Sequence, residues 1–191
     1  RDLPAHGSSQ GSPLPSIEMM SDWVSRCLDH LGVGRVALAG HSMGALVALE
    51  FAANNTDRVG TLALLGAAVP MAVSEELLGA ARREQAAAVD MMVLWGHAYS
   101  SQLGGNPVAG IHVVHTAKRL LERAQPGVLF NDLNACNNYQ NGEGSALKVT
   151  AKTTLVCGTE DKMTPLRAGR VLAESIPGCL LRTVPQCGHL L

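Results

Sequence analysis

The pattern that most constrains the fold is a short apolar run that meets Gly-x-Ser-x-Gly and passes directly into a helical pattern. The run at 36–39 predicts a buried strand, and the alanines and leucines behind Gly44 predict a helix. Ser42 then occupies the apex of a sharp turn, where the backbone is strained and side chains at Gly40 and Gly44 would clash with the neighbouring chain. Such a turn lifts the serine hydroxyl clear of the sheet and aims the Met43 N–H at the place where an oxyanion forms.

Strand and helix patterns alternate on both sides of a long central stretch. We expect a first helix that Ser16 caps and that ends at Gly32. Strands follow at 35–40 and 59–65, joined by a helix from Met43 to about Asn55. Two further strands at 153–157 and 179–184 are joined by a helix with Thr164 as N-cap and Pro165 in its first turn. Short strand-helix-strand units indicate a parallel sheet. The strand at 35–40 shows no alternation of polarity, which is typical of a strand covered on both faces. We expect the four strands to follow one another in chain order across the sheet, with 35–40 at an edge.

The central stretch has a different pattern. Residues 74–99 and 111–124 are helical in periodicity, a polar stretch follows at 131–145, and no strand is apparent among them. The sequence therefore predicts an α/β fold in three parts: a first part of a parallel-sheet core at 1–71, an inserted helical cap at 72–147, and a second part of the core at 148–191.

Three residues that can perform nucleophilic catalysis stand at equivalent places. Ser42, Asp161 and His189 each follow the carboxyl end of a predicted parallel strand, which is the edge where α/β proteins build their sites. Glu160 is a neighbouring alternative to Asp161, but the Gly-x-x-Asp spacing favours Asp161. The order serine, aspartate, histidine along the chain is that of one well-known hydrolase scaffold.

The sequence resembles the α/β-hydrolase fold superfamily along its whole length. The similarity rests on Asp2-Leu3-Pro4-Ala5-His6-Gly7-Ser8-Ser9, Gly40-His41-Ser42-Met43-Gly44, Gly158-x-x-Asp161-x-x-Thr164-Pro165 and Gly188-His189, which resemble the loop after the fourth strand, the nucleophile elbow, the acid loop and the histidine loop. Ala5 stands where the family usually has glycine. The resemblance implies neither a metal nor an organic cofactor.

Acyl-transfer chemistry gives each of these residues a role. His189 would take the proton of the Ser42 hydroxyl, Asp161 would orient the imidazole, and the Met43 N–H would stabilise the oxyanion. We therefore predict a serine hydrolase that cleaves a carboxylic ester of a small-molecule acyl substrate through an acyl-enzyme. The same machinery acting on an amide, an N-terminal proline residue or a carbon–carbon bond is an alternative, as is a binding module without catalytic activity. Members with an aspartate nucleophile are disfavoured because position 42 is serine.

An apolar stripe at helical spacing, formed by Met91, Met92, Trp95 and Tyr99, either packs the cap on the core or lines the acyl pocket. We predict Met91, Trp95 and Tyr99 as pocket residues, with His41 at the floor. His6 is expected near the pocket mouth.

Charge and composition exclude several classes of function. The chain has no stripe of lysine and arginine that would indicate a nucleic-acid surface, and no apolar run near the ~20 residues that span a bilayer. Its five cysteines fit neither a zinc pattern nor full pairing, which favours reduced thiols and a cytoplasmic location.

We interpret the chain as a fragment, because it begins at Arg1 and stops at His189-Leu190-Leu191 with no closing helix. The second oxyanion donor would then lie upstream, and the chain alone is expected to be a poor enzyme.

Overall fold

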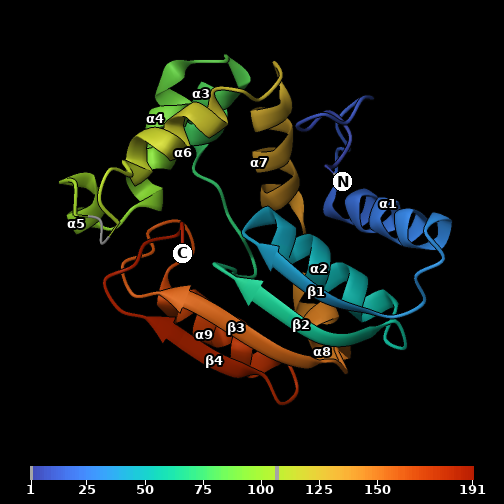
Figure 1. The fold of residues 1–191 in the computed structure, drawn as a ribbon. Coiled ribbons are helices and arrows are strands. Elements are labelled where there is room, and N and C mark those ends of the chain that lie inside the picture. The colour runs from blue at the N-terminus through green and yellow to red at the C-terminus, as the bar shows by residue number, and fades with distance from the viewer. Residues whose placement is uncertain (1, 106–107) are drawn as a thin grey trace.

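The computed structural model describes residues 2–105 and 108–191, and within them the chain folds around one parallel sheet (Figure 1). The strands are β1 (Val36–His41), β2 (Val59–Leu65), β3 (Lys152–Gly158) and β4 (Leu180–Val184), arranged in the order β1-β2-β3-β4. Each neighbouring pair is parallel. The predicted α/β class, the parallel sheet and the order of its strands are therefore confirmed.

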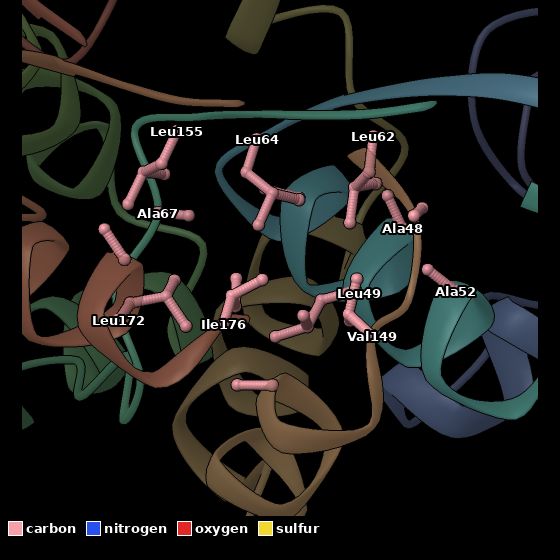
Figure 2. Close-up of a cluster of buried hydrophobic side chains, with 14 of the residues drawn as sticks. Ala48, Leu49, Ala52, Leu62, Leu64, Ala67, Val149, Leu155, Leu172 and Ile176 are labelled. Carbon is pink, nitrogen blue, oxygen red and sulfur yellow. The ribbon is translucent and has the colours of Figure 1, made fainter. Parts of the chain in front are cut away.

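Four helices build the main core against one face of this sheet. They are α1 (Ile17–His30), α2 (Met43–Asn54), α8 (Gly142–Lys148) and α9 (Leu166–Ser175). The Ser16 side chain caps α1 by accepting a hydrogen bond from the Met19 N–H, as its sequence position predicts. Leu49, Leu62, Leu155 and Ile176 pack together between the helices and the strands and are almost completely buried (Figure 2).

The opposite face of the sheet is exposed in the described part of the chain. Ala37 and Ala39 on β1, Thr61 on β2 and Lys152 on β3 are all solvent-exposed. The prediction that the strand at 35–40 is covered on both faces is therefore wrong for this chain. The physical reason is that the core helices pack on the face to which Leu62, Leu64 and Leu155 point, so alternate residues face outward.

The stretch between β2 and β3 is helical and contains no strand among its described residues. Its helices are α3 (Glu75–Arg82), α4 (Ala86–Gly96), α5 (Tyr99–Gln102), α6 (Val113–Leu121), α7 (Val128–Asn138) and then α8. The predicted helix at 74–99 is interrupted, because Glu84 takes a left-handed φ of 53°. The polar stretch at 131–145 carries most of α7 and the first half of α8, since Leu133, Ala135 and Cys136 give α7 a buried face despite its polar composition.

Helices α3 to α7 lie beyond the carboxyl ends of the strands (Figure 1), whereas α8 belongs to the main core through Ala146. The division into 1–71, 72–147 and 148–191 stays a prediction. Residue 1 of its first part and residues 106 and 107 of its second part lie outside the described residues.

A buried carboxylate on α2 connects these layers. Glu50 accepts hydrogen bonds from the Tyr139 hydroxyl (2.6 Å), the Ser145 hydroxyl (2.7 Å) and the Asn54 amide (2.8 Å). Three donors satisfy carboxyl oxygens that would otherwise be costly to bury. Helix α2, which begins after Ser42, is thereby joined to Tyr139, the residue that follows α7, and to Ser145 on α8.

The cysteines are free thiols, and Cys136 and Cys157 are buried. Burial raises the pKa of Cys136 to about 12 and that of Cys157 to about 11, so neither thiol is a ready nucleophile. Among the helices of residues 2–105 and 108–191, none combines the length and the apolarity that crossing a bilayer requires.

Candidate active site

Ser42 stands on a strained turn between β1 and α2. Its φ of 53° and ψ of −120° lie in a region that residues other than glycine rarely adopt, and the Ser42 N–H donates to the Leu65 carbonyl at 2.9 Å. The Ser42 side chain makes no capping bond to α2, so the hydroxyl is not used to stabilise its own helix. The strained turn that the sequence pattern predicts at Ser42 is therefore present.

The two glycines of this turn differ in how much space surrounds their missing side chains. A β-carbon at Gly40 would lie 2.1 Å from the Gly44 carbonyl oxygen, so no larger residue fits there. A β-carbon at Gly44 would meet no atom within 4 Å among the described residues, apart from its chain neighbours and the backbone of its own helix turns. The predicted clash is confirmed for Gly40, where a side chain would meet the backbone carbonyl of Gly44. It is wrong for Gly44, because the backbone of Gly44 makes this contact and the space at its missing side chain is open.

Asp161 and His189 meet beyond the ends of β3 and β4. The Asp161 Oδ2 atom lies 2.9 Å from His189 Nδ1, and both residues are buried, with exposed fractions of 6% and 3%. A carboxylate can only accept, so Nδ1 of His189 carries a proton, and the neutral ring then has a bare lone pair at Nε2. The expected hydrogen bond between the acid and the histidine is thus present, and Glu160 instead accepts from the Tyr99 N–H.

Asp161 is held as a carboxylate by its surroundings. Its Oδ1 atom accepts from the Met163 N–H at 2.9 Å and the Thr164 N–H at 2.8 Å. Burial by itself raises the pKa of Asp161, but the hydrogen bond and charge of His189 together with the bonds from Thr164 outweigh it and lower the pKa below its ordinary value. The acid is therefore ionised and oriented at neutral pH.

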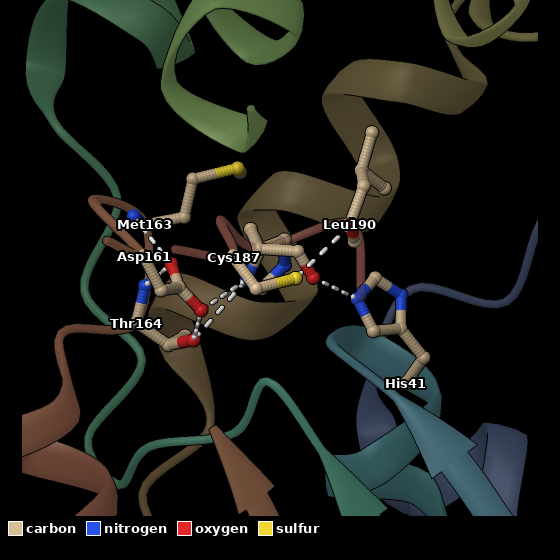
Figure 3. Close-up of polar contacts among 7 residues, drawn as sticks. His41, Asp161, Met163, Thr164, Cys187 and Leu190 are labelled. Carbon is tan, nitrogen blue, oxygen red and sulfur yellow. Dashed lines mark hydrogen bonds and ion pairs between the residues drawn. The ribbon is translucent and has the colours of Figure 1, made fainter. Parts of the chain in front are cut away.

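Thr164 has a role that its sequence position did not predict. Its hydroxyl donates to Asp161 Oδ2 at 2.7 Å and lies 3.1 Å from His189 Nδ1 (Figure 3). It does not cap α9, whose N-cap position is Pro165. The predictions of Thr164 as N-cap and of Pro165 in the first turn are therefore wrong, because α9 begins at Leu166 and the Thr164 hydroxyl donates its hydrogen bond to the Asp161 carboxylate. The Asp-x-x-Thr spacing is the signal that could have indicated it, since aspartate side chains commonly bond the backbone two or three residues on.

Ser42 and His189 face the same pocket but are not hydrogen-bonded to each other. His189 Nε2 is buried and has no partner within the described part of the chain. Ser42, Met43, His41, Thr164 and His189 all line one pocket of about 400 Å³. The expected bond from Ser42 to His189 is thus not formed here, and in unliganded enzymes such contacts are often longer than in the substrate complex.

The wall of the pocket is mostly apolar and comes from the helical stretch. Trp95 and Met92 on α4 line it with Met71, Leu77, Leu129 and Leu133. Met91 and Tyr99 lie outside this lining, so their prediction as pocket residues is wrong. Met91 packs instead against the cluster around Leu77 and Leu78, and Tyr99 is 65% exposed because the chain leaves α4 at Gly96.

The residues around His189 are held by contacts from distant segments. The Leu190 N–H donates to the Gly96 carbonyl at 3.0 Å, and a β-carbon at Gly188 would lie 2.6 Å from the same oxygen. The end of α4 therefore packs directly on the loop that carries His189.

The family is decided by a match along almost the whole chain. Residues 2–191 match the model of the alpha/beta hydrolase family. The chain belongs to this family. This α/β hydrolase is 28% identical over 197 residues to a pimeloyl-[acyl-carrier protein] methyl ester esterase of Chromobacterium violaceum, which covers 98% of this chain and 74% of that protein.

Two further similarities agree with the family. A 2-hydroxy-6-oxononadienedioate/2-hydroxy-6-oxononatrienedioate hydrolase of Pseudomonas putida is 31% identical over 172 residues, covering 85% of this chain and 59% of that protein. The structure of a thermophilic esterase from Thermogutta terrifontis has a TM-score of 0.81 and 25% identity, covering 99% of this hydrolase and 71% of that chain. These three proteins are named as esterases or hydrolases, and this chain is a hydrolase of the same family.

The charged groups in the lining of this α/β hydrolase are few. Asp132 on α7 is bound by His6 Nε2 at 2.7 Å, while His6 Nδ1 lies 2.9 Å from the Pro4 carbonyl oxygen. Both ring nitrogens face acceptors, so this geometry favours the doubly protonated imidazolium. Burial lowers the pKa of His6, but the hydrogen bonds and charge of its partners outweigh burial and raise it. His6 thus contacts a residue of the pocket lining without belonging to that lining, and its expected place near the pocket mouth stays a prediction.

The described residues of this α/β hydrolase contain no cluster of candidate metal ligands. Within residues 2–105 and 108–191, no three side chains of histidine, cysteine, aspartate or glutamate come close enough together to hold an ion.

Proposed function

We propose that this α/β hydrolase cleaves carboxylic esters with Ser42 as nucleophile, His189 as general base and Asp161 as the orienting acid. One observation carries the proposal: His189 Nε2 is buried without a partner among the described residues, in the pocket that Ser42 lines, while Asp161 holds Nδ1. Leaving a buried polar atom unpaired costs about 1–3 kcal/mol, which a hydrolase recovers when the atom accepts the serine proton.

The mechanism follows from this arrangement. The Ser42 oxygen attacks the ester carbonyl carbon while its proton passes to His189 Nε2. The N–H of Met43, the first residue of α2, lacks a partner within its own helix and donates to the oxyanion. Collapse of the tetrahedral intermediate expels the alcohol, which takes the proton from His189. Water then attacks the acyl carbon while His189 Nε2 takes its proton. The proton returns to the Ser42 oxygen as the carboxylic acid product leaves.

The substrate class follows from the lining. The wall is built mostly from leucine, methionine, valine and tryptophan side chains. The negative charge of Asp132 is matched by His6, and Lys162 adds an exposed positive charge to the lining. Such a pocket favours small-molecule esters with an apolar acyl group. The esterases among the relatives support this choice of bond.

Cleavage of a carbon–carbon bond in a ring-cleavage product is the second candidate. The observation that favours it is the 31% identity to the hydrolase of 2-hydroxy-6-oxononadienedioate. The same Ser42 and His189 would serve it.

A panel of 4-nitrophenyl esters tests the proposal, with wild type beside Ser42→Ala and with Ser8→Ala as a control for an exposed serine. We expect hydrolysis of esters by wild type and Ser8→Ala only, and a fluorophosphonate adduct on Ser42. Hydrolysis that survives in Ser42→Ala, or no adduct and no turnover of any ester, would overturn the proposal. If neither an adduct nor ester turnover is found, turnover of a ring-cleavage diketone would indicate the carbon–carbon reaction. Absence of that turnover as well would indicate a binding module.

A further inference from the structure

His41 makes a contact with His189 that the catalytic mechanism does not use. His41 Nε2 lies 2.8 Å from the backbone carbonyl oxygen of His189, although the two residues are 148 positions apart in the chain (Figure 3). Their ring centroids are 4.8 Å apart with an angle of 48° between the planes. His41 is thus bound to the backbone of the residue that carries the general base, whereas Asp161 binds the side chain of that residue at Nδ1.

The space around this pair is tight. Gly66 has a left-handed φ of 54°, and a β-carbon on it would lie 3.1 Å from His189 Nδ1 and 3.4 Å from His41 Nε2. The turn after β2 therefore packs its bare backbone against both rings. Neither ring can move far without breaking its hydrogen bond, so the bond from His41 fixes where the backbone of His189 stands.

The protonation of His41 suits this role. A carbonyl oxygen only accepts, so Nε2 of His41 carries a proton, and the neutral ring is sufficient to donate it. Burial lowers the pKa of His41 and the charge of His189 lowers it further, while the bond to the carbonyl and the charge of Asp161 raise it, with a net lowering. His41 is therefore neutral at neutral pH. A neutral neighbour does not oppose the positive charge that His189 gains when it takes the serine proton.

We propose that His41 is a positioning residue, whose Nε2–H holds the backbone of His189 so that the imidazole stays between Asp161 and Ser42. The proposal rests on the proposed function for its kinetic test but also has a test that needs no turnover. The proposed role of His41 depends on its N–H donor and not on its ring. A role in packing alone would depend on the ring and not on the donor.

Matched substitutions test this. His41→Gln keeps a neutral N–H donor at the reach of Nε2, whereas His41→Phe keeps a ring without a donor. We expect His41→Gln to retain kcat within about threefold, and His41→Phe to lose about 10- to 100-fold in kcat with KM changed less than about twofold, because misplacing a catalytic group by about 1 Å has effects of that order. Equal kcat in wild type and His41→Phe would overturn the proposal. So would equal losses in both variants.

The second readout is the proton resonance of His189 Nδ1–H, assigned by its loss in Asp161→Asn. We expect the downfield signal to be the same in wild type and His41→Gln and to shift or broaden in His41→Phe. If Ser42→Ala still hydrolyses esters, the proposed function fails while this signal still decides the positioning. If His41→Phe does not fold, His41→Asn, whose amide ends short of the carbonyl, replaces it. An unchanged signal in the donor-less variant would overturn the proposal.

Discussion

Gly66 and His189 are in such close contact that the imidazole depends on the absence of a side chain. A β-carbon at Gly66 would lie 3.1 Å from both Nδ1 and Cε1 of His189, closer than ordinary van der Waals contact. The glycine also has a φ of 54°, which residues with a side chain rarely adopt. A turn after β2 therefore shapes the position of a residue that follows β4.

The first prediction concerns this contact. Gly66→Ala should displace the His189 ring and lower kcat for a short activated ester by at least about 10-fold. Gly178→Ala is the matched control, because Gly178 has a φ of 68° but open space around its missing β-carbon. Both variants share the backbone strain of about 1 kcal/mol, so melting temperatures should fall similarly while only Gly66→Ala loses kcat. Equal activities of the two variants would contradict the assignment of His189.

The second prediction concerns the Thr164 hydroxyl. Thr164→Val removes a donor to Asp161 Oδ2 while it keeps the shape of the side chain. We expect kcat to fall by about 10- to 150-fold, which corresponds to the 1.5–3 kcal/mol of a hydrogen bond to a charged group, and KM to stay nearly constant. Thr164→Ser should restore most of the rate. A valine variant as active as wild type would show that the bonds to Asp161 Oδ1 and His189 are sufficient.

The third prediction concerns the acyl pocket. Trp95 lines it, so Trp95→Ala should enlarge it and shift preference toward longer acyl chains in a 4-nitrophenyl ester series. Leu94→Ala is the control on the same helix, because Leu94 is 51% exposed and lies outside the lining. The shift in the ratio of kcat/KM values should exceed the effect on melting temperature. A large loss of stability with an unchanged ratio would mean that Trp95 only packs α4 onto its neighbours.

The fourth prediction concerns pH and the pair of His6 and Asp132. The pKa of His6 is raised in the folded state, so its contribution to stability is complete below the unfolded pKa of about 6.5 and is lost as pH rises through the folded value. Wild type should therefore exceed His6→Gln in urea midpoint at about pH 5.5, and the difference should shrink by about pH 9. A difference independent of pH would contradict the ion pair.

The fifth prediction concerns the buried Glu50. Tyr139→Phe removes the hydroxyl that donates to Glu50 at 2.6 Å and leaves the carboxylate with fewer donors in the core. We expect the free energy of unfolding to fall by about 1–3 kcal/mol. Tyr99→Phe, at a 65% exposed tyrosine, should change it by less than about 0.5 kcal/mol. Urea unfolding of both variants measures this, and similar effects would argue against a structural role for the network.

Local pattern in the sequence determined much of this protein. The apolar run before Gly40, the glycine there and the helical pattern behind Ser42 together specify a strand, a strained turn and a helix, because each depends on residues close in the chain. The alternation of strands and helices specified the parallel sheet and its order. Asp161 and His189 could be found because parallel strands end at a common edge, which brings residues that follow them together.

Only the tertiary structure decided what those residues touch. Thr164 serves Asp161 and not α9, and His41 holds a carbonyl 148 positions away. Met92 and Trp95 line the pocket where Met91 and Tyr99 do not. Within the described residues the sheet is covered on one face, although the pattern at 35–40 predicts a strand covered on both. Each of these facts depends on the direction in which one segment packs against another that is distant in the chain, and neither hydrophobic periodicity nor motif spacing contains that direction.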